Sequence, residues 1–382
     1  MKPFNSVVPL AGPFLPLSAV ADWQVNLGQG VTEISRTVFD LHMLILYICV
    51  AIGVVVFGVM AWSFILHRKS RGAVAHDFHE NRLIEITWAL IPLLILVAMA
   101  VPAAKTLFKM YDHAEAGLDI QVTGYQWKWR YQYLGHDIDS FSNLATPWKQ
   151  INNEMKKDAD YLLEVDNPLV IPVGMKVRFL LTSNDVIHSW WVPALAVKKD
   201  AIPGFINEAW TKVDEPGTYR GQCAEFCGLH HGFMPIVVEA KNQVEFQQWL
   251  AKVKSKQQEL TTPPDRAWTL SDLAMQGEQV YNRVCVACHQ ANGEGIPGAF
   301  PALKGSAVVM GDIGKHIDVV MNGRTGTAMQ AFSEQLNPTD VAAVISYERN
   351  AWGNDTGDMV TPQEIQLWKQ VGGADDIPES YR

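Results

Sequence analysis

Two long stretches without a charged side chain constrain the fold of this 382-residue chain most strongly. Residues 41–66 and residues 86–104 contain no Asp, Glu, Lys or Arg. At ~1.5 Å of rise per residue, a helix over either stretch matches the ~30 Å hydrocarbon core of a bilayer. Pro92 and Pro102 interrupt the second stretch, which membrane helices tolerate. We therefore expect a transmembrane hairpin surrounded by membrane lipid, rather than two buried helices of a soluble protein.

The short connection between the two expected spans is basic. It reads His67-Arg68-Lys69-Ser70-Arg71, and short loops rich in Lys and Arg stay in the cytoplasm. Both ends of the chain then lie on the periplasmic or outer side of a bacterial cytoplasmic (inner) membrane. Residues 1–21 end in Ala19-Val20-Ala21 and are similar to a signal peptide, with an ordinary N-terminal arm as the alternative. The arm and the hairpin would occupy residues 22–112.

Beyond the hairpin the hydrophobic pattern changes twice. Residues 118–245 contain short alternating runs separated by Gly, Pro, Asn and Asp, which is typical of an all-β sandwich or barrel. Residues 246–268 indicate a helix and then the proline-marked linker "TTPPDRAW". Residues 269–372 are helix-like with Gly-rich loops. The sequence therefore predicts a multidomain chain with a helical hairpin, an all-β domain and an all-α domain.

The charge distribution limits the possible partners. The formal net charge of −9 argues against nucleic acid as a partner, because few cations remain to neutralise phosphates. Residues 271–382 contain 14 Asp or Glu and 7 Lys or Arg, a net charge of −7. An acidic face on this domain would favour docking of a basic electron donor, although a merely solvated surface explains the charge equally well.

Four of the five cysteines form two close pairs, an arrangement that is unusual for a disulfide framework. The first pair lies in "CAEFCGLHHGFM", which places two thiols, His230, His231 and a thioether within residues 223–234. Soft sulfur together with imidazole favours copper or zinc over hard cations. A closed tetrahedral zinc site suits the methionine poorly, and a single blue copper needs only one cysteine. Two coppers bridged by both thiolates fit the segment better.

This segment resembles the copper loop of cytochrome c oxidase subunit II, which holds the binuclear CuA site in a cupredoxin-like Greek-key sandwich. The resemblance includes "SNDVIHSWWVPALAVKKDAIPG" and "GYQWKWRYQY" and covers residues 30–245 with the hairpin. In that family the spacing selects His231 rather than His230 as a ligand. The copper ligands that the resemblance implies are His188, Cys223, the backbone carbonyl of Glu225, Cys227, His231 and Met234.

The resemblance also implies roles for three further groups. The carboxylate of Glu225 matches a ligand of a Mg²⁺ shared with subunit I. Trp127 matches the residue at which electrons enter from cytochrome c, although alternating aromatics on a strand often only pack, and a tethered haem would alter the route. Glu85 matches a glutamate at the cytoplasmic mouth of a proton pathway. A carboxylate at a helix N-terminus is also favourable by itself, by ~0.3–1 kcal/mol.

The second cysteine pair, Cys285 and Cys288, precedes His289 in the attachment signature of a covalent haem c. A thioredoxin-like redox pair is the alternative, but it explains neither the histidine nor the lack of a βαβ pattern. The sixth iron ligand should be a methionine, and the candidates are Met310, Met321 and Met329. The segment "GRTGTAMQAF" resembles the methionine loop of class I cytochromes c, which selects Met329.

Taken together, the motifs resemble subunit II of a haem-copper oxidase with a fused cytochrome c domain, as in caa3-type oxidases. Such a subunit accepts electrons from cytochrome c or a similar donor through haem c and CuA. It passes them to subunit I, which works with other oxidase subunits and reduces O₂ to water with proton translocation. The dicopper-containing small subunit of a nitric oxide reductase is the main alternative. A copper-delivery protein would need neither six ligands nor a haem, and quinol oxidase subunits resemble a version without the copper ligands.

Overall fold

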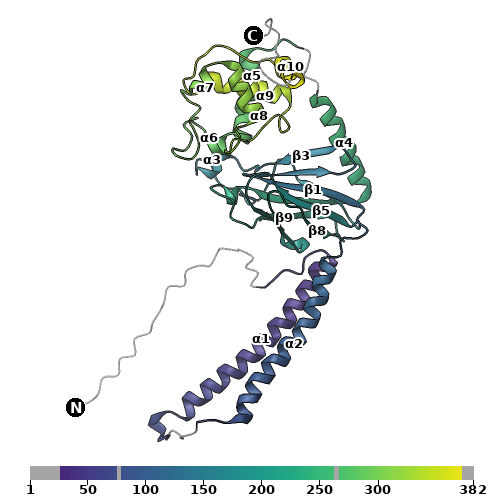
Figure 1. The fold of residues 1–382 in the computed structure, drawn as a ribbon, viewed down its shortest axis with the longest axis vertical. Coiled ribbons are helices and arrows are strands. Elements are labelled where there is room, and N and C mark those ends of the chain that lie inside the picture. Colours follow the sequence, from purple (N-terminus) through teal and green to yellow (C-terminus); the bar gives the residue numbers. More distant parts are fainter. Residues whose placement is uncertain (1–25, 75–78, 262–265, 372–382) are drawn as a thin grey trace, which may run out of the picture.

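The computed structural model describes residues 26–74, 79–261 and 266–371 of the chain. These residues form a helical hairpin, a β-domain of two sheets and a helical C-terminal domain (Figure 1). The C-terminal domain lies at the end of the β-domain opposite the hairpin (Figure 1). The expected signal peptide, residues 1–21, falls outside the described residues.

The hairpin presents a continuous apolar surface. Its elements are α1 (Glu33–Leu66), the 3-10 turn η1 (Lys69–Arg71) and α2 (Arg82–Met110). Thr32 caps α1 and Asn81 caps α2, because each side chain accepts hydrogen bonds from backbone N–H groups of the first turn. Both helices are long and apolar enough to cross a membrane. Phe57 and Phe64 are 70% and 73% exposed, so the hairpin requires lipid or partner helices around it.

The β-domain is a sandwich of two five-stranded sheets, with strand orders β3-β2-β1-β5-β8 and β4-β10-β9-β6-β7. The strands are β1 (Leu118–Tyr125), β2 (Lys128–Tyr133), β3 (Ile138–Ser142), β4 (Leu169–Pro172), β5 (Val177–Ser183), β6 (His188–Val192), β7 (Val197–Ala201), β8 (Asn207–Thr211), β9 (Gly217–Cys223) and β10 (Pro235–Lys241). Strand β1 pairs in parallel with β5, and β10 in parallel with β4; the other neighbours are antiparallel.

Alternation along the strands builds the core between the two sheets. In β5, Val177, Phe179 and Leu181 are fully buried while the residues between them are partly exposed or turned away. Trp129 and Trp190 are also fully buried in this core. The loops add α3 (Trp148–Ile151), η2 (Pro193–Leu195) and η3 (His231–Phe233).

Helix α4 (Gln243–Thr261) follows the last strand and leads toward the C-terminal domain. The helices of that domain are α5 (Leu270–Val284), α6 (Val286–His289), α7 (Ala307–Met310), α8 (Ile313–Asn322), α9 (Pro338–Asn350) and α10 (Pro362–Val371). Helices α5 and α9 pack at very short range, since a Cβ on Gly277 would lie 2.1 Å from the carbonyl oxygen of Ala343. A glycine is therefore required at this crossing. The predicted combination of helical hairpin, β-sandwich and all-α domain is confirmed.

Candidate metal centres

The loop between β9 and β10 gathers the sulfur and imidazole groups that the sequence singled out. Cys223 ends β9, and Cys227, His231 and Met234 follow before β10 begins. His188 is the first residue of β6, which pairs with β9 next to the loop. One loop and one neighbouring strand of the same sheet thus supply all of these side chains.

Three groups surround the thiol of Cys223. Its Sγ lies 3.9 Å from Sγ of Cys227 and 3.9 Å from Nδ1 of His188. The carbonyl oxygen of Glu225 is 3.4 Å from the same sulfur. Cys223 therefore has one imidazole and one weak oxygen donor beside it.

The thiol of Cys227 has a corresponding but different set of neighbours. Its Sγ lies 3.5 Å from Nδ1 of His231 and 3.6 Å from Sδ of Met234. The adjacent His230 turns its ring away from the thiols, toward the C-terminal domain. The six groups form a soft donor set with two shared sulfurs, which fits a pair of copper ions better than a hard cation.

A carboxylate fixes the orientation of the His188 ring. Oδ1 of Asp185 lies 2.8 Å from Nε2 of His188, which leaves Nδ1 facing Cys223. Such an outer partner is common for metal-binding histidines. Burial alone lowers the pKa of His188, but the contacts with Asp185 and Cys223 outweigh it and raise that pKa overall. A Cβ on Gly124 would lie 2.7 Å from Cδ2 of His188, so the ring also depends on that glycine.

The two thiols are electrostatically linked. Hydrogen bonding from Cys227 lowers the pKa of the Cys223 thiol, although burial opposes this effect. The same contact and burial raise the pKa of Cys227. The pair therefore favours a form that carries one thiolate, and a bound cation would favour two.

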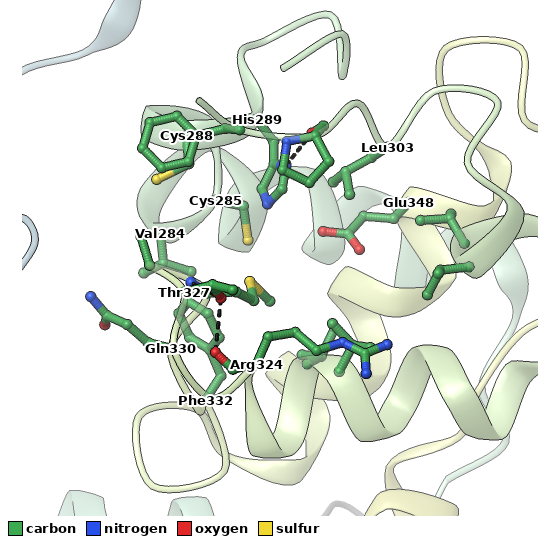
Figure 2. Close-up of a pocket in the computed structure, with 18 of the residues that line it drawn as sticks. Val284, Cys285, Cys288, His289, Leu303, Arg324, Thr327, Gln330, Phe332 and Glu348 are labelled. Atoms are coloured by element: carbon green, nitrogen blue, oxygen red, sulfur yellow. Dashed lines mark hydrogen bonds between the residues drawn. The ribbon is translucent and has the colours of Figure 1, made fainter. Parts of the chain in front are cut away.

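The C-terminal domain contains a cavity of about 380 Å³ next to the haem-attachment signature. Figure 2 shows Cys285, Cys288 and His289 on one side of this cavity and Arg324 and Thr327 on the other. Apolar side chains form much of the wall, namely Val284, Leu303, Val309, Val320, Phe332, Leu336 and Val344. Two thiols and an imidazole at an apolar cavity fit a covalently bound haem.

The ring of His289 is held in a defined orientation. Its Nδ1 lies 2.9 Å from the carbonyl oxygen of Pro301. Because a carbonyl only accepts hydrogen bonds, Nδ1 carries the proton and the lone pair of Nε2 is free. This tautomer is the one that can bind iron through Nε2.

The three candidate methionines lie in different environments. Met329 lines the cavity. Met321 is 2% exposed and belongs to the hydrophobic core of the domain, whereas Met310 is 44% exposed. Gly323, with φ +68°, allows the loop to reverse before Met329; a Cβ there would meet the Met329 carbonyl oxygen at 2.5 Å.

The cavity also has a buried polar pair that sequence reasoning missed. Nε2 of His316 lies 2.9 Å from Oε2 of Glu348, and both side chains are at most 5% exposed. Both line the cavity, and Figure 2 shows Glu348 opposite the cysteines' side chains. Nδ1 of His316 is buried and has no hydrogen-bond partner within the described part of the chain. This pair therefore adds one buried carboxylate and one imidazole to an otherwise largely apolar wall.

Two residues of the β-domain complete the cavity wall. Gln126 and Lys128, at the turn from β1 to β2, line it together with the residues of the C-terminal domain. Lys128 is 5% exposed and donates to the side-chain oxygen of Gln335. Burial lowers the pKa of its amine to about 8. The sequence offered no signal for this contribution, since it depends on how two domains pack.

Trp127 lies between the copper loop and the C-terminal domain. Its Nε1 donates to the carbonyl oxygen of Cys227 at 3.3 Å, and its ring meets that of Phe300 edge to face at 6.1 Å between centroids. Gln126 donates to the same Cys227 carbonyl at 2.8 Å. The indole therefore contacts the copper loop on one side and the wall of the haem cavity on the other.

The two expected glutamates occupy quite different positions. Glu225 is exposed on the copper loop beside Phe226, which is 80% exposed. Glu85 lies in the first turn of α2, at the end of the hairpin far from the β-domain (Figure 1). The Asn81 backbone N–H donates to its Oε1 at 3.3 Å, which is a local capping contact.

Three family models match successive parts of the chain. Residues 20–106 match the transmembrane domain of cytochrome c oxidase subunit II, and residues 118–241 match its periplasmic domain. Residues 272–347 match cytochrome c oxidase, cbb3-type, subunit III. The last match identifies the C-terminal helices as a cytochrome c domain.

Known proteins share the first two parts. A probable cytochrome c oxidase subunit 2 of Rickettsia felis is 43% identical over 229 residues, which are 60% of this chain and 71% of that protein. Cytochrome c oxidase subunit 2 of Cyanidium caldarium is 35% identical over 233 residues, 61% of this chain and 91% of that protein. The solved periplasmic domain of subunit II (CoxB) of Bradyrhizobium japonicum is 39% identical, covers 37% of this chain and 96% of that domain, and gives a TM-score of 0.34.

Fold, sites and matches define a membrane-anchored redox subunit with a cupredoxin-like β-domain and a cytochrome c domain. The chain belongs to the cytochrome c oxidase subunit II family. It is therefore a subunit of a haem-copper oxidase that functions in a complex with subunit I. Membership in this family implies CuA copper, and the cytochrome c domain implies haem.

Proposed function

We propose that this chain is the electron-accepting subunit of a caa3-type terminal oxidase. It would take electrons from cytochrome c or a similar donor and deliver them to subunit I, which reduces O₂ to water with proton translocation. When bound, haem c and the binuclear copper supply one-electron transfer. The residues of this chain hold the two groups, exclude water from them and keep them close together.

One observation carries the proposal: a complete soft donor set and a haem-attachment signature lie in adjoining domains of one chain. Trp127 contacts the Cys227 carbonyl on one side and Phe300, a wall residue of the haem cavity, on the other. This position supports Trp127 as the residue where electrons enter the copper domain, even with a tethered haem. A copper-delivery protein would have no need for such a contact.

For the copper ions, we propose that Cys223 and Cys227 bridge the pair. His188 and His231 would each bind one copper, as their separate contacts with the two thiols suggest. The remaining weak ligands would be the Glu225 carbonyl and Met234. Both thiols are buried, so the protein keeps water away from the metals.

For the haem, we propose covalent attachment to Cys285 and Cys288, with His289 and Met329 as iron ligands. The free Nε2 of His289 and the position of Met329 at the cavity wall support this assignment. The cytochrome domain would extend over residues 269–372 and the copper domain over residues 118–245, joined by the helix and linker of residues 246–268.

The remaining assignments concern the membrane and the partners. The exposed carboxylate of Glu225 would bind Mg²⁺ at the interface with subunit I. Glu85 would lie at the cytoplasmic mouth of a proton pathway, in addition to its capping contact. The hairpin, with spans of about residues 41–66 and 86–104, would cross the bacterial inner membrane with both termini outside, after cleavage of residues 1–21.

The direct test is the metal and haem content of the purified full-length chain in detergent. We expect two coppers and one low-spin haem per chain, by elemental analysis and optical spectroscopy. One copper per chain would contradict the binuclear site. An assembled complex that consumes nitric oxide instead of O₂ would favour the reductase alternative.

A further inference from the structure

His230 occupies a position that neither the copper site nor the haem site explains. It directly precedes His231, whose Nδ1 lies near the Cys227 thiol. The His230 ring instead points out of the copper loop and reaches the cytochrome domain. Its side chain is nonetheless only 8% exposed.

The ring of His230 hydrogen-bonds to the haem-attachment loop itself. Nε2 lies 2.7 Å from the carbonyl oxygen of Ala287, which sits between Cys285 and Cys288. A carbonyl only accepts, so Nε2 donates and Nδ1 is unprotonated. That Nδ1 is buried without a hydrogen-bond partner among the described residues. The hydrogen bond to the Ala287 carbonyl, which crosses the domain boundary, is therefore the one polar contact of the ring among the described residues.

Three aromatic rings hold the imidazole in place. Trp127 and Phe233 meet it edge to face, with centroids 4.8 Å and 5.2 Å away, and Trp148 lies at 5.8 Å. All three belong to the β-domain. Packing on several sides restricts the imidazole to one rotamer, so its hydrogen bond can fix the position of Ala287.

The β-domain holds the opposite side of the haem cavity as well. The Gln126 carbonyl accepts from Gln330 at 2.7 Å, and Lys128 donates to Gln335. Arg130, two residues further along β2 and on the same face as Lys128, lies 3.1 Å from Glu334. These three contacts reach the segment that follows Met329. Among these four β-domain residues, His230 is the one that contacts the haem-attachment loop.

We propose that His230 is a positioning residue that seats the haem-attachment loop on the copper loop. His230 and the contacts of the β1–β2 turn would together hold the two domains in a single docked arrangement. This arrangement would set the distance between haem and copper. The chain path from Cys288 through the Ala287 carbonyl, across one hydrogen bond and along His230 to His231 contains no solvent gap. This inference rests on the proposed function, because it presumes that both groups are bound.

The test compares His230→Ala with His230→Gln in the full-length, metal-loaded chain. A glutamine amide can still donate to the Ala287 carbonyl, whereas alanine leaves that buried acceptor unpaired. Leu229→Ala is the matched control, since Leu229 is the preceding residue of the same loop and is 58% exposed. Optical spectra first establish that each variant retains both centres.

The first measurement is the rate at which flash-reduced haem passes its electron to the oxidised dicopper site. One electron leaves the haem iron and arrives at copper, and no covalent bond forms or breaks. We expect His230→Ala to slow this transfer about tenfold by lowering the docked fraction, with His230→Gln and Leu229→Ala near the wild-type rate. An unchanged rate in His230→Ala, or no rescue by His230→Gln, would overturn the proposal.

A second measurement reports geometry without any electron transfer. The ferric haem accelerates the relaxation of the oxidised dicopper signal in electron paramagnetic resonance, and this effect falls steeply with distance. We expect a weaker acceleration in His230→Ala alone. Loss of the copper signal in that variant would make His230 a ligand and refute the positioning role. A wild-type chain without copper or haem would instead refute the proposed function.

Discussion

The two candidate metal centres differ in how many domains build them. The side chains of the copper site come from one loop and one neighbouring strand of a single sheet. The haem cavity takes its ligands from the cytochrome domain but part of its wall, Gln126 and Lys128, from the β-domain. The copper site is therefore local to one rigid scaffold, whereas the haem site depends on the docking of two domains.

This difference has consequences for how each centre responds to change. A substitution of a copper ligand should affect copper and leave the haem intact, because the donors all lie within the β-domain. A substitution on the β1–β2 turn should reach the haem, although the turn contains no haem ligand. Four predictions test this asymmetry.

The largest expected effect is that of Cys227→Ser. The thiol of Cys227 contacts Cys223, His231 and Met234. The substitution therefore removes a proposed bridging ligand that these three side chains share. We expect the dicopper absorption to disappear while the haem spectrum stays unchanged. Cys49→Ser, at an exposed cysteine of α1, is the control and should leave both spectra intact. Loss of haem in Cys227→Ser would break the proposed independence of the copper site.

Met329→Ala should remove the thioether–iron absorption band without loss of the covalent haem. Met329 lines the cavity, whereas Met321 lies in the core. Met321→Ala should therefore retain the band and instead reduce the free energy of unfolding by about 2–5 kcal/mol, measured by chemical denaturation. If Met321→Ala alone loses the band, the assignment of the sixth ligand is wrong.

Asp185→Ala should weaken copper binding without abolishing it. The carboxylate orients His188 through Nε2, and removal of such an outer partner typically costs about 10–100-fold in metal affinity. Competition with a copper chelator measures this change. Asp166→Ala, which removes hydrogen bonds to Asn143 in another segment, should bind copper normally. Equal affinities in the two variants would contradict the orienting role.

The smallest effect is expected for Lys128→Met, which removes a positive charge from the haem wall. A charge acting with ~1 kcal/mol shifts a one-electron potential by about 40 mV, and a cation favours the reduced haem. The potential should therefore fall in the variant. In the wild type it should also fall as the pH rises past the pKa of Lys128, which burial lowers, because the amine then becomes neutral.

Redox titrations of the full-length chain at several pH values check this shift. Lys304→Met is the control, because Lys304 lies 3.0 Å from Glu294 at an exposed position where water and salt screen its charge. A pH-dependent potential that persists in Lys128→Met would show that Lys128 is not the group whose titration shifts the haem potential.

Local patterns in the sequence predicted the haem attachment more fully than the copper site. Cys223, Cys227, His231 and Met234 lie within one short segment, and Cys285, Cys288 and His289 form a contiguous signature. The fold class also followed from the uncharged runs and the alternation of the strands. His188 required resemblance, because only the pairing of β6 with β9 brings it to the loop.

Residues that act by tertiary packing could not be predicted. Gly124 is required because a Cβ at this position would clash with the His188 ring. Asp185 orients the same ring because a turn brings its carboxylate to Nε2. His230 was expected only as a competitor of His231, since nothing in a sequence reveals which way adjacent imidazoles point. The wall contribution of Lys128 appears only when two domains meet.

The most direct test of the account is oxygen consumption by the assembled oxidase with a Cys285→Ser/Cys288→Ser chain. Reduced cytochrome c serves as donor, and copper analysis verifies that both coppers remain. The account predicts that oxygen consumption falls to background, because electrons reach the copper site through the tethered haem. Oxygen consumption at the wild-type rate would contradict it, since electrons would then enter the copper site without that haem.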